Sequence, residues 1–415
     1  MTTNRPGAPL ARRLGTLDAT AIGLGSMLGA GVFAVFAPAA AAAGSGLLLS
    51  LVIAGFIAYC NAASSAQLAA VHPASGGTYV YGRARLGHWW GFTAGWGFVV
   101  GKTASCAAMA LTFAAYAAPG FERPAAALAV AVLAAVNCAG ITRTARLTRV
   151  LLVAVLLVLV GFAALSAPAA WSGGPPDWFP HGPLGVLQAA GLLFFAFAGY
   201  ARIATLGEEV RDPERTIPRA ILLALPIAAV VYAGVGLVVL GVLGPHELAA
   251  STAPLADALT AAGHGGLTPV VRFGAAAASL GALLALIAGV GRTGLAMARE
   301  GDLPRFLAAV HPRFQVPHRA ELTVAAVVIA LVLTTDLRGV IGFSSFGVLV
   351  YYAIANASAF TQPAAERRWP RALNLLGLGG CLLLAATLPW TSVVVGLGIF
   401  AIGLLGRLVS RARAR

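Results

Sequence analysis

The chain has 415 residues, of which 59% are hydrophobic and only 10% are charged, and its mean hydropathy is +0.86. A soluble globular protein carries about 25% charged residues, so this composition excludes a soluble protein and predicts one embedded in a lipid bilayer. The net charge of +14 comes from arginines that flank apolar segments. That pattern is typical of membrane topology, and no nucleic-acid partner is expected.

Long apolar segments follow one another along the chain, and several are short enough to need tilt or flanking residues that reach the interface. About twelve are present, at 17–43, 45–71, 89–118, 124–141, 150–168, 183–207, 218–244, 269–291, 320–335, 339–360, 372–389 and 391–406. The connections between them are too short to hold a soluble domain. We therefore expect an all-α membrane protein of about twelve transmembrane helices, forming a single domain over residues 1–415.

The first apolar segment contains three glycines, Gly25, Gly29 and Gly31, in the motif GSMLGAGVF. Each interior glycine costs a helix about 1 kcal/mol relative to alanine, and a broken turn in hydrocarbon leaves backbone groups unsatisfied. Broken backbone inside a membrane persists where it lines a cavity or holds a ligand. The motif therefore predicts a helix break and a binding site. The alternative is close helix packing through small residues.

The third apolar segment carries the only lysine of the chain, Lys102. A charged residue near the centre of a span costs about 2.5–3.5 kcal/mol on insertion scales and indicates a function. Three roles remain open. Lys102 is a proton carrier, a determinant of substrate specificity, or a structural lysine that bonds to carbonyls or to a broken helix end.

A second break is expected in the sixth segment, around Phe194–Tyr200, five spans after the first. Two interrupted helices in corresponding positions of two five-helix halves are typical of inverted-repeat secondary transporters. On this interpretation one repeat covers about 14–170 and the other about 183–362, and two further helices lie at about 372–407.

The arginines are distributed unevenly between the two sides of the alternating topology. Only Arg123, Arg272 and Arg338 fall in connections on one side. By the positive-inside rule the other side is cytoplasmic, and an even number of spans places both termini there. We therefore expect a multi-pass protein of the plasma (inner) membrane with cytoplasmic N- and C-termini.

Four segments together resemble the amino acid–polyamine–organocation (APC) transporter superfamily. They are GSMLGAGVF in the first span, HPASGGTYVYGRARLG after the second, FFAFAGYARIATLGEEVRDPERTIPRAI in and after the sixth, and GRTGLAMAREGDLPRFLAAVHPRFQVPHRAEL between the eighth and ninth. The resemblance covers helices 1 to 10, and IATLGEEV is most similar to the cationic amino acid transporter branch and its bacterial relatives. It implies a carrier of amino acids across the plasma membrane that works by alternating access, and not an enzyme.

The resemblance also implies where an amino acid binds. A broken helix offers free N–H groups for a carboxylate and free carbonyls for an ammonium. By match to the family motif, the amides of Ala30 and Gly31 receive the carboxylate of the substrate. The carbonyl of Met27 accepts a hydrogen bond from its ammonium.

In the sixth span the resemblance assigns the carbonyls of Phe195 and Ala198 to the same ammonium, with Gly199 permitting the break. The Phe195 ring matches the aromatic gate of the family, and ordinary core or lipid contact is its alternative. Ala201 stands where members with cationic substrates commonly carry Asp or Glu. Neutral amino acids are therefore favoured, and a cationic amino acid or polyamine carrier is the alternative.

Neither coupling device of the family is evident. A sodium site would need hydroxyl groups from the eighth span, and none is present between Leu280 and Gly289. Proton-coupled members place a lysine in the fifth span, and Val155 stands at that position. Exchange or uniport is therefore as well supported as symport.

The cysteines lie singly within predicted helices, so neither a metal nor a cofactor is expected. The sequence does not indicate an oligomeric state.

Charged residues at the predicted cytoplasmic ends match gate positions of the family. Glu208 and Glu209 follow the sixth span, and Arg292 lies near the end of the eighth, followed by Glu300 and Asp302. We expect ion pairs among such residues to close an inner gate.

A sensor that binds amino acids without transporting them is the alternative from another functional class.

Overall fold

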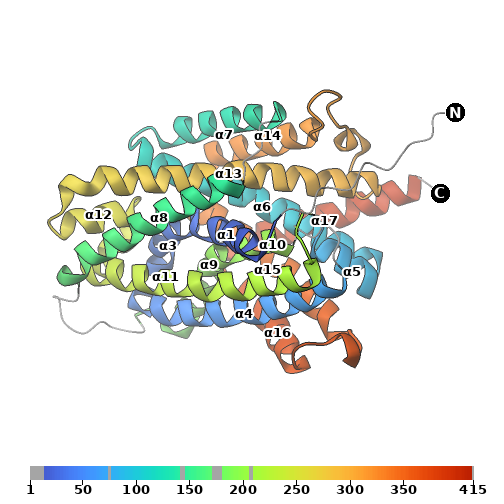
Figure 1. Ribbon diagram of the computed structural model, residues 1–415, viewed down its shortest axis with the longest axis horizontal. Helices are drawn as coiled ribbons and strands as arrows, with labels where there is room; N and C mark the ends of the chain where they lie inside the picture. Colours follow the sequence, from blue (N-terminus) through green and yellow to red (C-terminus); the bar gives the residue numbers. More distant parts are fainter. Residues whose placement is uncertain (1–13, 73–75, 141–144, 171–179, 205–208, 414–415) are drawn as a thin grey trace.

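A computed structural model describes residues 14–72, 76–140, 145–170, 180–204 and 209–413 (Figure 1). In these ranges the chain is almost entirely helical. Beyond one isolated parallel bridge between Leu14 and Val210, no β-structure forms in the described ranges. The predicted all-α class is confirmed.

The first half of the chain contains the first five predicted spans. Its elements are α1 (Thr16–Leu28), α2 (Gly31–Ala34), α3 (Phe36–Ala43), η1 (Gly44–Gly46), α4 (Leu47–Val71), α5 (Thr78–Leu86), α6 (His88–Ala117), α7 (Glu122–Cys138), α8 (Ala145–Ser166) and η2 (Ala167–Ala169). The first predicted span is thus divided among α1, α2 and α3. The short helix α5 corresponds to no apolar segment.

The second half contains the remaining predicted spans. Its elements are α9 (Gly182–Phe197), η3 (Ala198–Tyr200), α10 (Ala201–Ala204), α11 (Pro213–Ala250), α12 (Pro254–Ala261), η4 (Gly265–Leu267), α13 (Thr268–Arg299), η5 (Arg305–Ala308), α14 (His318–Thr334), α15 (Leu337–Phe360), η6 (Ala364–Glu366), α16 (Arg371–Thr387) and α17 (Trp390–Arg413). Gly244, at φ 71°, kinks α11 near its end.

Among the described residues, nine helices are long and apolar enough to cross a membrane. Three other predicted spans, α7, α14 and α16, are helices of 17 residues each. At 1.5 Å per residue such a helix is roughly 25 Å long, at the lower limit for a bilayer core of about 30 Å. The multi-span helical architecture is confirmed, and the boundaries of the two repeats stay a prediction.

Helices α6 and α15 form the interior of the bundle. In each, 83% of the most apolar window is buried, compared with 22% in the peripheral α17. Small residues let these two helices approach closely. A Cβ built on Gly347 would lie 2.9 Å from the Cα of Gly101, and one on Gly101 would lie 3.1 Å from the carbonyl oxygen of Ser344. In Figure 1, α7 and α14 run together along one edge, and α4 and α16 lie at the opposite edge.

A buried polar network connects α4, α15 and α16. The Asn356 side chain accepts a hydrogen bond from Ser64 over 2.7 Å and donates one to Asn61 over 2.6 Å. Asn374 donates to the Ser64 hydroxyl over 2.7 Å. Each such bond inside a membrane bundle contributes about 0.6 kcal/mol, with a maximum of about 1.7. The network therefore fixes the register of three helices.

Candidate substrate site

The first span is interrupted at Gly29 and Ala30. Helix α1 ends at Leu28, and α2 begins at Gly31 with Ala30 as its N-cap residue. The first N–H groups of a helix have no acceptor within it. The amide of Gly31 therefore begins a new helix at the place where the substrate carboxylate is expected. Ala30 and Gly31 are both buried.

The sixth span changes geometry where the sequence predicts a break. Helix α9 ends at Phe197, and the 3₁₀ turn η3 separates it from α10. A Cβ built on Gly199 would lie only 2.6 Å from the backbone nitrogen of Met27. A Cβ built on Gly31 would lie 2.9 Å from the Cβ of Ala196. The two interrupted spans therefore touch backbone to backbone, and the glycines permit this contact.

Tyr232 of α11 connects the two spans. Its hydroxyl lies 2.7 Å from the carbonyl oxygen of Met27 and 3.0 Å from that of Ala196, and donates toward both. The ring packs edge to face on Phe197, with centroids 5.0 Å apart. The Met27 carbonyl, which the family resemblance assigns to a substrate ammonium, thus already accepts a hydrogen bond from the protein. An isolated tyrosine in an apolar span gives no signal of this role, so sequence reasoning missed it.

Lys102 of α6 reaches the second break. Its Nζ donates a hydrogen bond to the carbonyl oxygen of Ala198 over 3.1 Å, and the residue is buried. Ala198 is the C-cap residue of α9, where the helix dipole favours a positive charge. The structural role considered for Lys102 predicts this contact. The same contact also places a cation within the expected substrate site.

The remaining predicted site residues lie in the same region. Phe195 and Ala201 are buried next to the break. An aromatic contact near the break is made by Phe194, the residue before Phe195. The Phe194 ring packs on Tyr352 with centroids 5.7 Å apart. The gate role of Phe195 therefore stays a prediction.

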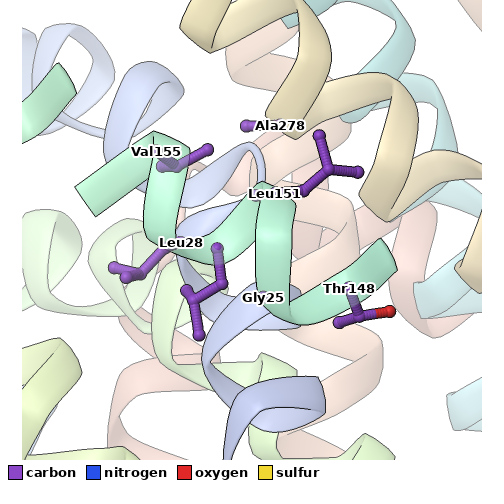
Figure 2. A pocket seen from close by; sticks show the side chains of 8 residues that line it. Gly25, Leu28, Thr148, Leu151, Val155 and Ala278 are labelled. Carbon is purple, nitrogen blue, oxygen red and sulfur yellow. The ribbon is translucent and has the colours of Figure 1, made fainter. Parts of the chain in front are cut away.

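Gly25 requires a correction, because it lies inside α1 and not at the break. A single glycine costs a helix only about 1 kcal/mol, which the surrounding packing offsets. Gly25 lines a cavity of ≈ 20 Å³ between α1, α8 and α13, together with Gly29 of the break (Figure 2). Its lining residues are Gly25, Leu28, Gly29, Thr148, Leu151, Leu152, Val155 and Ala278. One water needs about 10–15 Å³, so this space is too small for an amino acid.

Two residues assigned to the inner gate form an ion pair, and their gate role stays a prediction. The Arg292 guanidinium lies 3.8 Å from a carboxylate oxygen of Glu209, and both side chains are partly exposed. Glu208 lies outside the described residues. The backbone next to Glu209 also pairs with the start of the described chain, since Leu14 N–H donates to the Glu209 carbonyl and Arg211 N–H donates to the Leu14 carbonyl.

A second ion cluster surrounds Asp302. Its carboxylate lies 2.7 Å from the Arg407 guanidinium and 3.3 Å from that of Arg83, which also pairs with Glu300. The Tyr79 hydroxyl donates to Asp302 over 2.9 Å. Burial and the Asp302 carboxylate raise the pKa of the Tyr79 phenol, so it remains a donor at neutral pH. The sequence indicated Glu300 and Asp302, but not their partners on α5 and α17.

Comparison with known proteins gives a consistent result. The amino acid permease family matches residues 14–405. An uncharacterized transporter of Mycobacterium tuberculosis is 60% identical over 97% of this chain and 93% of its own length. The branched-chain amino acid permease BcaP of Bacillus subtilis is 27% identical, over 95% and 92%. The cationic amino acid transporter 4 of Homo sapiens is 30% identical, over 84% of this chain and 59% of its own length.

Proposed function

Because this chain belongs to the amino acid permease family, and is a multi-pass membrane transporter and not an enzyme, we propose that it carries neutral amino acids across the plasma membrane by alternating access. The substrate binds between the breaks of the first and sixth spans. The arginine-rich side, with both termini, faces the cytoplasm.

The contact between the two breaks carries this proposal. Gly199 lies against the backbone of Met27, and α2 starts afresh at Gly31. Amides at the start of one half-helix and carbonyls at the end of another supply both polar groups that a zwitterion requires. Movement of α1 and α2 relative to α9 and α10 would open this site to one side and then to the other.

Two observations favour neutral substrates. Ala201 supplies no carboxylate next to the break, and Lys102 supplies a positive charge there. The name of the Bacillus relative refers to branched-chain amino acids, which are neutral. A cationic amino acid carrier is the second candidate, favoured by the 30% identity to a human protein named as a cationic amino acid transporter.

Exchange or uniport fits the described residues as well as symport does. Val155 lines the small cavity between α1, α8 and α13, together with glycine, leucine, alanine and one threonine. This lining offers one hydroxyl and no charged side chain. Sodium is held by several oxygen ligands in protein sites, and a proton needs a titratable group.

Counter-flow in proteoliposomes tests the proposal. Vesicles loaded with unlabelled leucine, alanine, lysine or arginine are diluted into the corresponding radiolabelled amino acid, without an ion gradient. We expect transient accumulation of labelled leucine or alanine, and none in vesicles without protein. Accumulation of lysine or arginine alone would favour the cationic carrier. Saturable binding without accumulation would indicate the sensor.

A further inference from the structure

Lys102 places a buried cation at the contact between the first and sixth spans. Its ammonium is 3.1 Å from the Ala198 carbonyl oxygen, and the residue is 6% exposed. Ala198 directly precedes Gly199, where a built Cβ would lie 2.6 Å from the Met27 nitrogen. The ammonium is therefore held inside the bundle, at the broken helix end where the proposed substrate ammonium is also expected to bind.

No carboxylate neutralises this ammonium within the described part of the chain, where the ion pairs involve other residues. Next to the break, Ala201 supplies only a methyl group. The C-terminal end of α9 provides a partial negative charge, equivalent to about half an elementary charge. A full positive charge therefore faces only a partial negative one before any substrate arrives.

We infer that Lys102 determines substrate specificity by excluding amino acids with a cationic side chain. The inference rests on the proposed function for the identity of the ligand class. A neutral amino acid is a zwitterion with no net charge, so it adds none to the site. A side-chain ammonium or guanidinium adds a further cation that no carboxylate of the ligand balances, in a buried region where the low effective dielectric strengthens like-charge repulsion.

A structural role for Lys102 makes a different prediction. If the lysine only ties α6 to the end of α9, its loss weakens all ligands together by loosening the break. If its charge selects ligands, its loss changes the ratio between ligands. Lys102→Gln separates the two roles because an amide can still donate to the Ala198 carbonyl without carrying a charge.

The test uses L-norleucine and L-ornithine, whose side chains have the same length and end in a methyl group and an ammonium respectively. Their dissociation constants are measured by titration calorimetry on the purified full chain. The selectivity ratio is the constant for ornithine divided by that for norleucine. We expect this ratio to fall at least about tenfold, equivalent to 1.4 kcal/mol, in Lys102→Gln and Lys102→Met. It should be unchanged in Lys102→Arg, which keeps the charge.

Cys106→Ser is the matched control, because Cys106 lies one turn further along α6 and is also buried. Its selectivity ratio should equal that of the unchanged protein. If Lys102→Met does not fold, Lys102→Gln still gives the decisive measurement. An unchanged ratio in Lys102→Gln, or equal weakening of both ligands, would overturn the inference.

Counter-flow of the same ligands separates this inference from the proposed function. Binding with the expected ratio but without counter-flow would contradict transport and support the role of Lys102. Counter-flow with a ratio that is insensitive to Lys102→Gln would support transport and contradict the role of Lys102.

Discussion

At Gly199, the absence of a side chain determines how closely the first and sixth spans approach. A Cβ at this position would lie 2.6 Å from both the Met27 nitrogen and the Ser26 carbonyl carbon. These are backbone atoms, so no side chain can rotate away to relieve the overlap. Overpacking a well-filled interior costs typically 1–3 kcal/mol. At the residue scale, the site therefore depends on a glycine that makes no side-chain contact.

Gly199→Ala tests this dependence. We expect it to separate the two breaks, to reduce counter-flow of the transported amino acid by at least about tenfold, and to destabilise the protein by about 1–3 kcal/mol. Gly234→Ala on α11 is the control, because nothing lies within 4 Å of a Cβ built there. Thermal unfolding and counter-flow of both variants are compared. Full activity of Gly199→Ala would show that the breaks need not touch.

At the scale of elements, the Asp302 cluster connects parts of the chain that are distant in sequence. Asp302 follows α13, Arg83 belongs to α5, and Arg407 belongs to α17. The Arg407 guanidinium also lies over the rings of Trp89 and Phe92 at the start of α6, 4.8 and 4.6 Å from their centroids. The cluster therefore holds α17 against the arginine-rich end of the bundle.

Asp302→Asn is expected to destabilise this end strongly. It removes the charge that two arginines share, and the side chains of Asp302 and Arg407 are 3% and 1% exposed. Breaking a buried ion pair costs about 3–5 kcal/mol, because the remaining charge stays buried. Asp212→Asn is the matched control, since the Asp212–Arg215 pair is exposed and such pairs contribute about 0–1 kcal/mol. Unfolding temperatures are compared, and equal values for the two variants would contradict this account.

At the scale of the whole molecule, charge asymmetry predicts the orientation. Arg292 lies near the end of α13, and the ion pairs of Arg83 and Arg407 join Asp302 just beyond that end. By the positive-inside rule we expect this end to face the cytoplasm. The opposite end includes α12 and the turn before α13.

Cysteine labelling with a membrane-impermeant maleimide tests the orientation. We expect Ala261→Cys, exposed at the end of α12, to react in intact cells. Arg313→Cys, exposed between α13 and α14, should react only after permeabilisation. Cys60, Cys106 and Cys381 are buried and Cys138 is partly buried, so the unchanged protein serves as the background control. The reverse labelling pattern would contradict the predicted topology.

The parts of the fold that could be predicted have signals within one short stretch of sequence. Apolar length located the helices, and the clustered glycines at Gly29 and Gly31 located the first break. Gly25 was assigned to that break wrongly, because the sequence does not show how neighbouring helices support a glycine within α1. Tyr232 was missed for a related reason. Its partners, the carbonyls of Met27 and Ala196, lie on other spans.

The sequence by itself determined that this protein lies in a membrane, which stretches of chain form its long apolar helices, and that it resembles amino acid carriers. These properties follow from hydropathy, glycine placement and motifs, each contained in a short stretch of chain. Only the tertiary structure decided that Lys102 bonds to Ala198, that Gly199 touches Met27, and that Arg407 pairs with Asp302. The physical reason is that these contacts join separate helices, and the packing of the bundle determines which helix faces meet.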